Sequence, residues 1–226
     1  MTIRKGQPWG KTMSLPEDAL IASTDSELAD HVSESYPAAD IFDAAVTLSA
    51  SEIVLGVVGG DLHRTLGSPT HTPEELRNGA GVGFPIDLGV VRFTVSGEAG
   101  EGHHYSLFAA HLIATSRSSR SLWAGRTVIA MNAAFRGAEN LAPRGHPNDG
   151  RLDLIDGQLA PLDRRRAHKR TYAGSHVPHP NLEETRVRDI SISNETELYV
   201  ELDSSSRIRA RHFQIRCISD AVTVIV

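Results

Sequence analysis

Residues 130–155, AMNAAFRGAENLAPRGHPNDGRLDLI, hold the pattern that decides the fold. An apolar run ends at Asn132, a polar stretch follows, and a Pro-Asn-Asp-Gly turn leads into a second apolar run. Proline, asparagine, aspartate and glycine each favour tight turns, so the stretch reads as two strands joined through a turn. The sequence around it decides how far this pattern extends.

The same alternation of strand-like runs and turns continues from Phe84 to the C-terminus. The runs are DLGVVRFTV, HYSLFAAHLI, RTVIAMN, RLDLI, RVRDISIS, ELYVELD, RIRARHFQIR and AVTVIV. One helical segment, PLDRRRAHKRTY at 161–172, interrupts them. Residues 85–226 are therefore predicted to form an antiparallel β-sandwich or half-barrel with one helical excursion.

Residues 1–84 are predicted to form a smaller, abbreviated α/β region, which makes the whole chain α+β. Thr24 and Glu27 form a capping box in front of apolar residues at helical spacing, which predicts a helix near 25–35. The run EIVLGVV at 52–58 reads as a buried strand, and Thr72 caps a further helix that begins at a proline.

The strand at 52–58 runs into Gly59-Gly60-Asp61, and two interpretations of this loop are open. Glycines let backbone N–H groups approach an anion closely, as in nucleotide-binding loops. The same residues also make ordinary turns.

Composition restricts the classes of protein. No apolar run is long enough to span a membrane and no signal-like segment follows the N-terminus, so a cytoplasmic protein is expected. The single cysteine, Cys217, excludes a disulfide framework and is expected to pack in the core. Nucleic-acid binding is not expected, because no aromatic residues interleave with the arginines.

Charge is distributed unevenly over the chain. Residues 1–110 hold 6 Lys/Arg and 15 Asp/Glu, whereas residues 111–226 hold 17 and 13. The basic run DRRRAHKR at 163–170 could attract phosphates or an anionic membrane surface, and the simpler alternative is a solvated helix face. Trp123 is expected to be a packing residue. Alternatively, the segment SRSSRSLWAGR that contains it is the best candidate for a membrane-facing edge of a peripherally bound protein.

Several stretches occur in the order found in bacterial diacylglycerol kinases and related lipid kinases. They are VVGGD (57–61), PIDLGVV (85–91), residues 130–155, GSHVPHP (174–180), LYVELD and the final VTVIV. The sequence resembles this family, most closely from Ala130 to Pro180. The resemblance implies a C-terminal β-sandwich that carries the lipid-side machinery and a smaller N-terminal domain that binds ATP.

The resemblance also implies site residues. The family's ATP loop, Gly-Gly-Asp-Gly-Thr, corresponds to Gly59, Gly60 and Asp61, with Leu62 in place of the fourth glycine. Leucine there adds a side chain where a phosphate needs close approach. Asp203 corresponds to the aspartate of the family's Asp-Gly-Glu triplet, which acts as general base toward a lipid hydroxyl. Its alternative is a strand-end aspartate that caps a serine-rich turn.

The turn HPNDGRLD matches a family loop that binds a structural magnesium. In this sequence the Asp149 carboxylate and the carbonyls of His146 and Arg151 would be the oxygen ligands that Mg²⁺ prefers. The alternative is a plain turn between two strands that needs no metal.

Two functions follow as hypotheses. The first is a lipid kinase that uses ATP and Mg²⁺ to phosphorylate a lipid hydroxyl. The second is a non-catalytic lipid-binding or regulatory module that has lost the use of ATP, favoured by Leu62, the short N-terminal region and the missing glutamate after Asp203. Partners would be a lipid or an anionic membrane surface, and exposed strand edges make a homodimer plausible.

Overall fold

A computed structural model describes residues 9–97, 100–117, 122–205 and 207–226. Within these residues, eleven strands form one sheet whose main path runs β1-β4-β13-β12-β6-β7-β10-β11. Strand β5 pairs with β4, and the short strands β2 and β3 join the sheet through the end of β13. All pairs are antiparallel except β2 with β3 and β3 with β13.

The strands of this sheet are β1 (Lys11–Thr12), β2 (Ile21–Ala22), β3 (Val54–Val57), β4 (Val82–Gly97), β5 (Gly100–Phe108), β6 (His111–Thr115), β7 (Thr127–Met131), β10 (Leu152–Gly157), β11 (Leu182–Val187), β12 (Asp189–Leu202) and β13 (Arg207–Ile225). A separate hairpin consists of β8 (Phe135–Arg136) and β9 (Glu139–Asn140). The helices are α1 (Asp25–Ser35), α2 (Ala38–Phe42), α3 (Gly60–Thr65), α4 (Pro73–Glu75), the π-helical turn η1 (Leu76–Ala80) and α5 (Pro161–Thr171).

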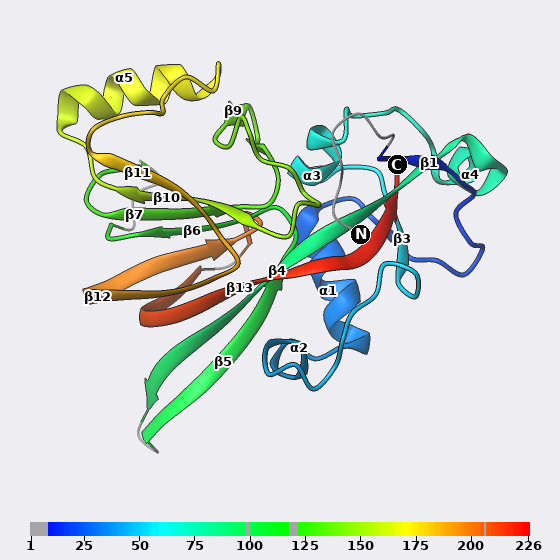
Figure 1. Cartoon of the computed structure of the whole chain (residues 1–226), viewed down its shortest axis with the longest axis horizontal. Coiled ribbons are helices and arrows are strands. Elements are labelled where there is room, and N and C mark those ends of the chain that lie inside the picture. The colour runs from blue at the N-terminus through cyan, green and yellow to red at the C-terminus, as the bar shows by residue number, and fades with distance from the viewer. Residues whose placement is uncertain (1–8, 98–99, 118–121, 206) are drawn as a thin grey trace.

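Alternation along the strands divides the core of the larger part into two layers. Leu112 and Ala114 of β6 face a core enclosed by the folded sheet, whereas Ile113 faces the opposite side. Helix α5 covers that opposite side over β7, β10 and β11, as Figure 1 shows. Cys217 lies buried in the enclosed core, as predicted.

Trp123 lies in the layer under α5, where it is 1% exposed. The packing role expected of Trp123 is therefore confirmed, and the alternative of a membrane-facing ring is wrong, because the ring packs inside the protein. Residues 118–121 of the predicted membrane-facing segment lie outside the described residues.

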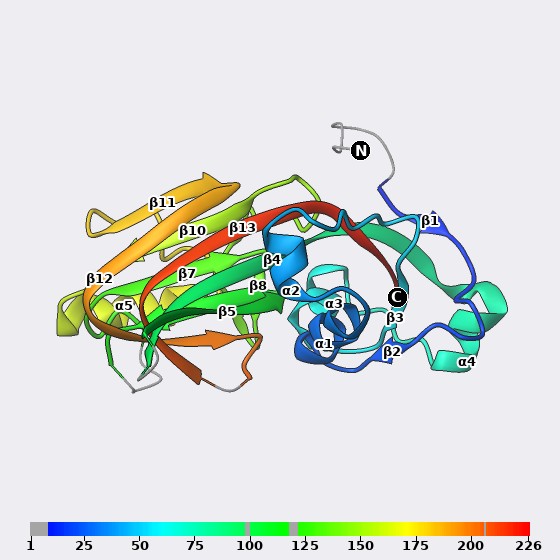
Figure 2. The same ribbon diagram turned by 90° about the horizontal axis from the view of Figure 1, so that it is seen from below.

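The N-terminal helices α1, α2 and α3 pack against the other end of the sheet (Figure 2). Strand β4 serves both parts, since Ile86 and Leu88 face the helices and Val91 and Phe93 face the enclosed core. Thr24 accepts the N–H of Glu27 at the start of α1, as the capping box predicted.

The strand boundaries differ from the prediction in several places. The run RVRDISIS belongs to two strands, because β11 ends at Val187 and β12 runs from Asp189 through ELYVEL to Leu202. The run HYSLFAAHLI is two strands, because the chain leaves β5 at Phe108 and enters β6 at His111. The runs RIRARHFQIR and AVTVIV are a single strand, β13, whose register against β4 shifts between Ile218 and Val222. This irregularity contains Asp220, whose φ of 50° is left-handed.

The α+β class with a larger antiparallel sheet is confirmed. The domain division after residue 84 stays a prediction, as does the homodimer. None of the helices in the described residues is long and apolar enough to cross a bilayer.

Candidate functional site

The loop Gly59-Gly60-Asp61 begins helix α3. The backbone N–H groups at this helix start donate hydrogen bonds to a side chain of the protein itself. One carboxylate oxygen of Asp25, in the first turn of α1, accepts the N–H of Asp61 at 2.6 Å. The other accepts the N–H of Leu62 at 3.0 Å. Asp25 is only 6% exposed. A carboxylate of the protein therefore lies where a nucleotide phosphate would have to accept these hydrogen bonds.

The two glycines serve the contact between α1 and α3. A Cβ atom on Gly59 would clash with the Ser23 carbonyl, and one on Gly60 would clash with the Asp25 carboxylate. Gly60 also has a φ of +93°, which a residue with a side chain rarely adopts. Leu62 points away into the helical core and is fully buried. The expectation that Leu62 itself obstructs a phosphate is wrong, because Asp25 is the group that contacts the amides.

The side chain of Asp61 connects the loop to the sheet. One oxygen accepts the N–H of Gly137 at 2.6 Å, and the other lies 3.7 Å from Nδ1 of His111. Burial lowers the pKa of His111 to about 4, so the imidazole is neutral near pH 7 and this contact is not an ion pair. Burial raises the pKa of Asp61.

Asp203 follows strand β12 and binds the segment that separates β5 from β6. Its carboxylate accepts three backbone N–H groups, from Ala109 at 2.7 Å, Ala110 at 2.9 Å and His111 at 2.8 Å. Its own N–H donates to the His111 carbonyl at 3.0 Å. Asp203 and Ser204 both have left-handed φ angles, of 45° and 60°. These contacts make Asp203 a clamp on the strand break, and it also lines a cavity of about 360 Å³.

Asp25, Asp61 and Asp203 together form what we call the acidic cluster. Burial raises the pKa of Asp203 to about 7, and repulsion from Asp25 adds to the effect of burial. Burial likewise raises the pKa of Asp25 to about 6, with a contribution from the charge of Asp61. The structure thus brings the predicted ATP-loop residue Asp61 and the predicted base Asp203 into one cluster. Sequence reasoning missed Asp25, which reads locally as an ordinary acidic residue in a first helical turn.

Two further buried polar residues, Asn132 and Asp87, lie in the quoted motifs but were not predicted from the sequence as site residues. Asn132, at the end of β7, donates from Nδ2 to the carbonyls of Asp87 and Ala109, both at 2.8 Å. The Asp87 carboxylate accepts the N–H of Gly150 at 2.6 Å and of Asp220 at 2.8 Å. Asn132 and Asp87 therefore link the strand break beside Asp203 to the turn 147–150.

The predicted magnesium loop contains its own cation. Asp149 accepts the N–H of Arg151 at 3.1 Å with one oxygen, and its other oxygen pairs with the Arg186 guanidinium. Arg186 also pairs with Asp153, from Nε at 3.2 Å. A guanidinium on the one carboxylate ligand does not fit a resident Mg²⁺, because the two cations would compete for the same oxygen. The magnesium site predicted at His146, Asp149 and Arg151 is untested, and the pairing of Asp149 with Arg186 argues against it.

We expect the melting temperature of the wild type to be the same in EDTA and in millimolar Mg²⁺. In Arg186→Gln the guanidinium is gone, so Mg²⁺ should now stabilise the fold, by about 1–3 kcal/mol well above its dissociation constant. Arg209→Gln is the matched control, since it removes an arginine paired with Glu197 on another strand. A wild type that Mg²⁺ stabilises as strongly as Arg186→Gln would show instead that the loop holds metal despite Arg186.

The chain is similar to a known protein family. Residues 93–226 match the model of the YegS C-terminal NAD kinase beta sandwich-like domain. The chain belongs to this family. The resemblance to lipid kinases is confirmed by this match and by the solved structures that share the fold.

A diacylglycerol kinase from Bacillus anthracis str. Sterne is similar with a TM-score of 0.52 and 16% identity, over 76% of this chain and 66% of that chain. Two other structures from the same organism have TM-scores of 0.53 and 0.54 at 15% and 14% identity. The chain spans about two thirds of the length of these proteins. A search of curated proteins gave no match.

Proposed function

We propose that this member of the YegS C-terminal family is a lipid-binding module that does not use ATP at the Gly59-Gly60-Asp61 loop. The observation that carries the proposal is the pair of hydrogen bonds from the Asp61 and Leu62 amides to Asp25. A phosphate could bind these amides only after displacing a buried carboxylate. Family membership supports the lipid side of the proposal, since the matched part is the sheet.

Electrostatics supports the same conclusion. A nucleotide phosphate at this loop would lie beside Asp25 and Asp61, with Asp203 close enough to Asp25 for repulsion to raise its pKa. Like charges in a poorly solvated site repel strongly, because little water screens them. Two cations, Arg136 and Arg64, act on Asp61, where their charges lower the pKa and partly oppose the effect of burial. Asp25 therefore already accepts the hydrogen bonds of the loop amides, and the charges of the acidic cluster would repel a nucleotide phosphate.

A second candidate function is phosphoryl transfer with Asp203 as the base. It is favoured by one observation, the pKa of about 7 that burial gives Asp203, since a general base works best with a pKa near the operating pH. The three N–H groups on its carboxylate oppose this role, because they occupy the oxygens that would receive a proton.

Labelled ATP with Mg²⁺ and a panel of diacylglycerols and long-chain lipid alcohols separates the two functions. We expect no transfer of label above the protein-free background, under conditions in which a diacylglycerol kinase gives labelled product. Asp203→Asn is the control variant. Transfer by the wild type that Asp203→Asn abolishes, with folding intact, would establish the kinase and refute the proposal.

A further inference from the structure

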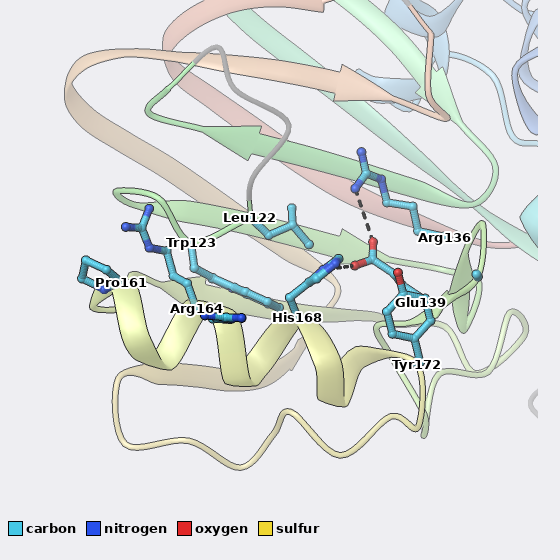
Figure 3. Close-up of a pocket in the computed structure, with 10 residues that line it drawn as sticks. Leu122, Trp123, Arg136, Glu139, Pro161, Arg164, His168 and Tyr172 are labelled. Atoms are coloured by element: carbon cyan, nitrogen blue, oxygen red, sulfur yellow. Dashed lines mark hydrogen bonds and ion pairs between the residues drawn. The ribbon is translucent and has the colours of Figure 1, made fainter.

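A pocket of about 710 Å³ lies beside helix α5 (Figure 3), and its lining contains no residue of the acidic cluster. Five of its lining residues come from one face of α5 and its end: Pro161, Arg164, Arg165, His168 and Tyr172. They recur at intervals of one, three or four residues, which places them on one side of a helix. The facing wall comes from the Leu122–Trp123 turn and the β8–β9 hairpin. The volume is in the range of small-molecule sites.

The acidic group in this pocket is already paired. The carboxylate of Glu139 lies 3.6 Å from an Arg136 nitrogen and 3.2 Å from Nδ1 of His168, as the dashed lines in Figure 3 mark. It also accepts the hydroxyl of Thr171 at 3.2 Å. Arg136 has a second carboxylate partner, Glu201, at 3.3 Å. Glu139 is therefore not available to neutralise other cations.

Two arginines of the pocket are not paired in this way. Within the part of the chain that the structure describes, the guanidinium groups of Arg164 and Arg165 have no hydrogen bond or ion pair. Guanidinium groups bind phosphate oxygens through charge-assisted and often bidentate hydrogen bonds. Behind them, Leu122 and Trp123 close the pocket as part of the core and are only 9% and 1% exposed. Two free cations at an open pocket match a ligand with a phosphate group.

The surroundings of the pocket indicate that this ligand comes from a membrane. Leu162 and Tyr172, at the two ends of α5, are large apolar side chains that are 61% and 55% exposed. Between them the helix carries five Lys/Arg residues and one aspartate, Asp163. A basic helix with exposed apolar residues is suited to the surface of an anionic bilayer.

We infer that the pocket beside α5 binds the phosphate-bearing headgroup of an anionic phospholipid at a membrane surface. Arg164 and Arg165 bind the phosphate, and the exposed side chains of Leu162 and Tyr172 contact the adjoining hydrocarbon at the membrane surface. This inference rests on the proposed lipid-binding function and names its site and ligand class. A solvated helix face would need no particular side of α5, whereas this site requires the side that carries Arg164 and Arg165.

Sedimentation with phosphatidylcholine vesicles, with and without phosphatidic acid, tests the inference. We expect the wild type to bind only the vesicles that contain phosphatidic acid. The variant Arg164→Gln/Arg165→Gln should bind them about tenfold more weakly or worse, because it loses two charge-assisted contacts. Lys169→Gln/Arg170→Gln is the matched control: it removes the same charge from the same helix outside the pocket, and its affinity should stay within about threefold of the wild type. Both pairs are on exposed or half-buried positions, and circular dichroism checks that each variant is folded.

The outcomes distinguish the two proposals. Equal losses in the two variants would overturn the pocket, since binding would then follow the total charge of α5. Full competition by inorganic phosphate at similar affinity would overturn the lipid as the source of the phosphate. No binding of the wild type to any vesicle would overturn the proposed lipid-binding function itself.

Discussion

Asp203→Ala is expected to lower the free energy of unfolding by about 4 kcal/mol. The substitution leaves the N–H groups of Ala109, Ala110 and His111 without their acceptor inside the protein. A buried donor without a partner loses its solvation, which costs about 1–3 kcal/mol for each of these N–H groups. Removal of the buried carboxyl, whose pKa burial raises to about 7, offsets part of this loss. Since domains are stable by only about 5–15 kcal/mol, the loss would be a large part of the total.

Urea unfolding followed by circular dichroism measures this effect. Ser204→Ala is the matched control, because Ser204 is the exposed next residue and shares the left-handed backbone. It should change the free energy of unfolding by less than about 0.5 kcal/mol. If Asp203→Ala were as stable as the wild type, Asp203 would not be the clamp that separates β5 from β6.

Asp25→Ala is expected to cost about 2–3 kcal/mol, less than Asp203→Ala. It leaves two amides unbound at the start of α3, those of Asp61 and Leu62. Removing the carboxylate also relieves its repulsion with Asp203, which offsets part of the loss. The measurement is again the free energy of unfolding in urea.

Asp30→Ala serves as the control for Asp25→Ala, since Asp30 is an exposed aspartate of the same helix. It should be within about 0.5 kcal/mol of the wild type. Equal stabilities of Asp25→Ala and Asp30→Ala would mean that the loop amides do not depend on Asp25, and the main support for the proposed function would be lost.

Local signals in the sequence predicted what is decided locally. The capping box of Thr24 and Glu27 places the start of α1 correctly, because its hydrogen bonds span only three or four residues. The apolar runs at β6 and β7 predicted strands, and both strands are buried along nearly their whole length. Proline and glycine around the turn 147–150 likewise marked a real strand boundary.

The features that decide the site depend on residues far apart in the sequence. Nothing in HYSLFAAHLI announces a break at Ala109, because the group that holds the break is Asp203. Ser219-Asp220 looks like a turn between two strands, yet the Asp87 carboxylate binds the Asp220 N–H and the strand continues. The role of Asp25 depends on a loop that the chain reaches only after β3. Family motifs identified the loop and Asp203 but could not reveal which groups of the chain already bind them.

A calorimetric titration of the wild-type protein with ATP in the presence of Mg²⁺ tests the central claim, that Asp25 holds the amides of the Gly59-Gly60-Asp61 loop in place of a nucleotide. We predict no saturable heat of binding up to millimolar ATP. Saturable binding of one ATP per chain at micromolar concentration, lost when Gly60 is replaced by alanine in a variant that stays folded, would contradict it.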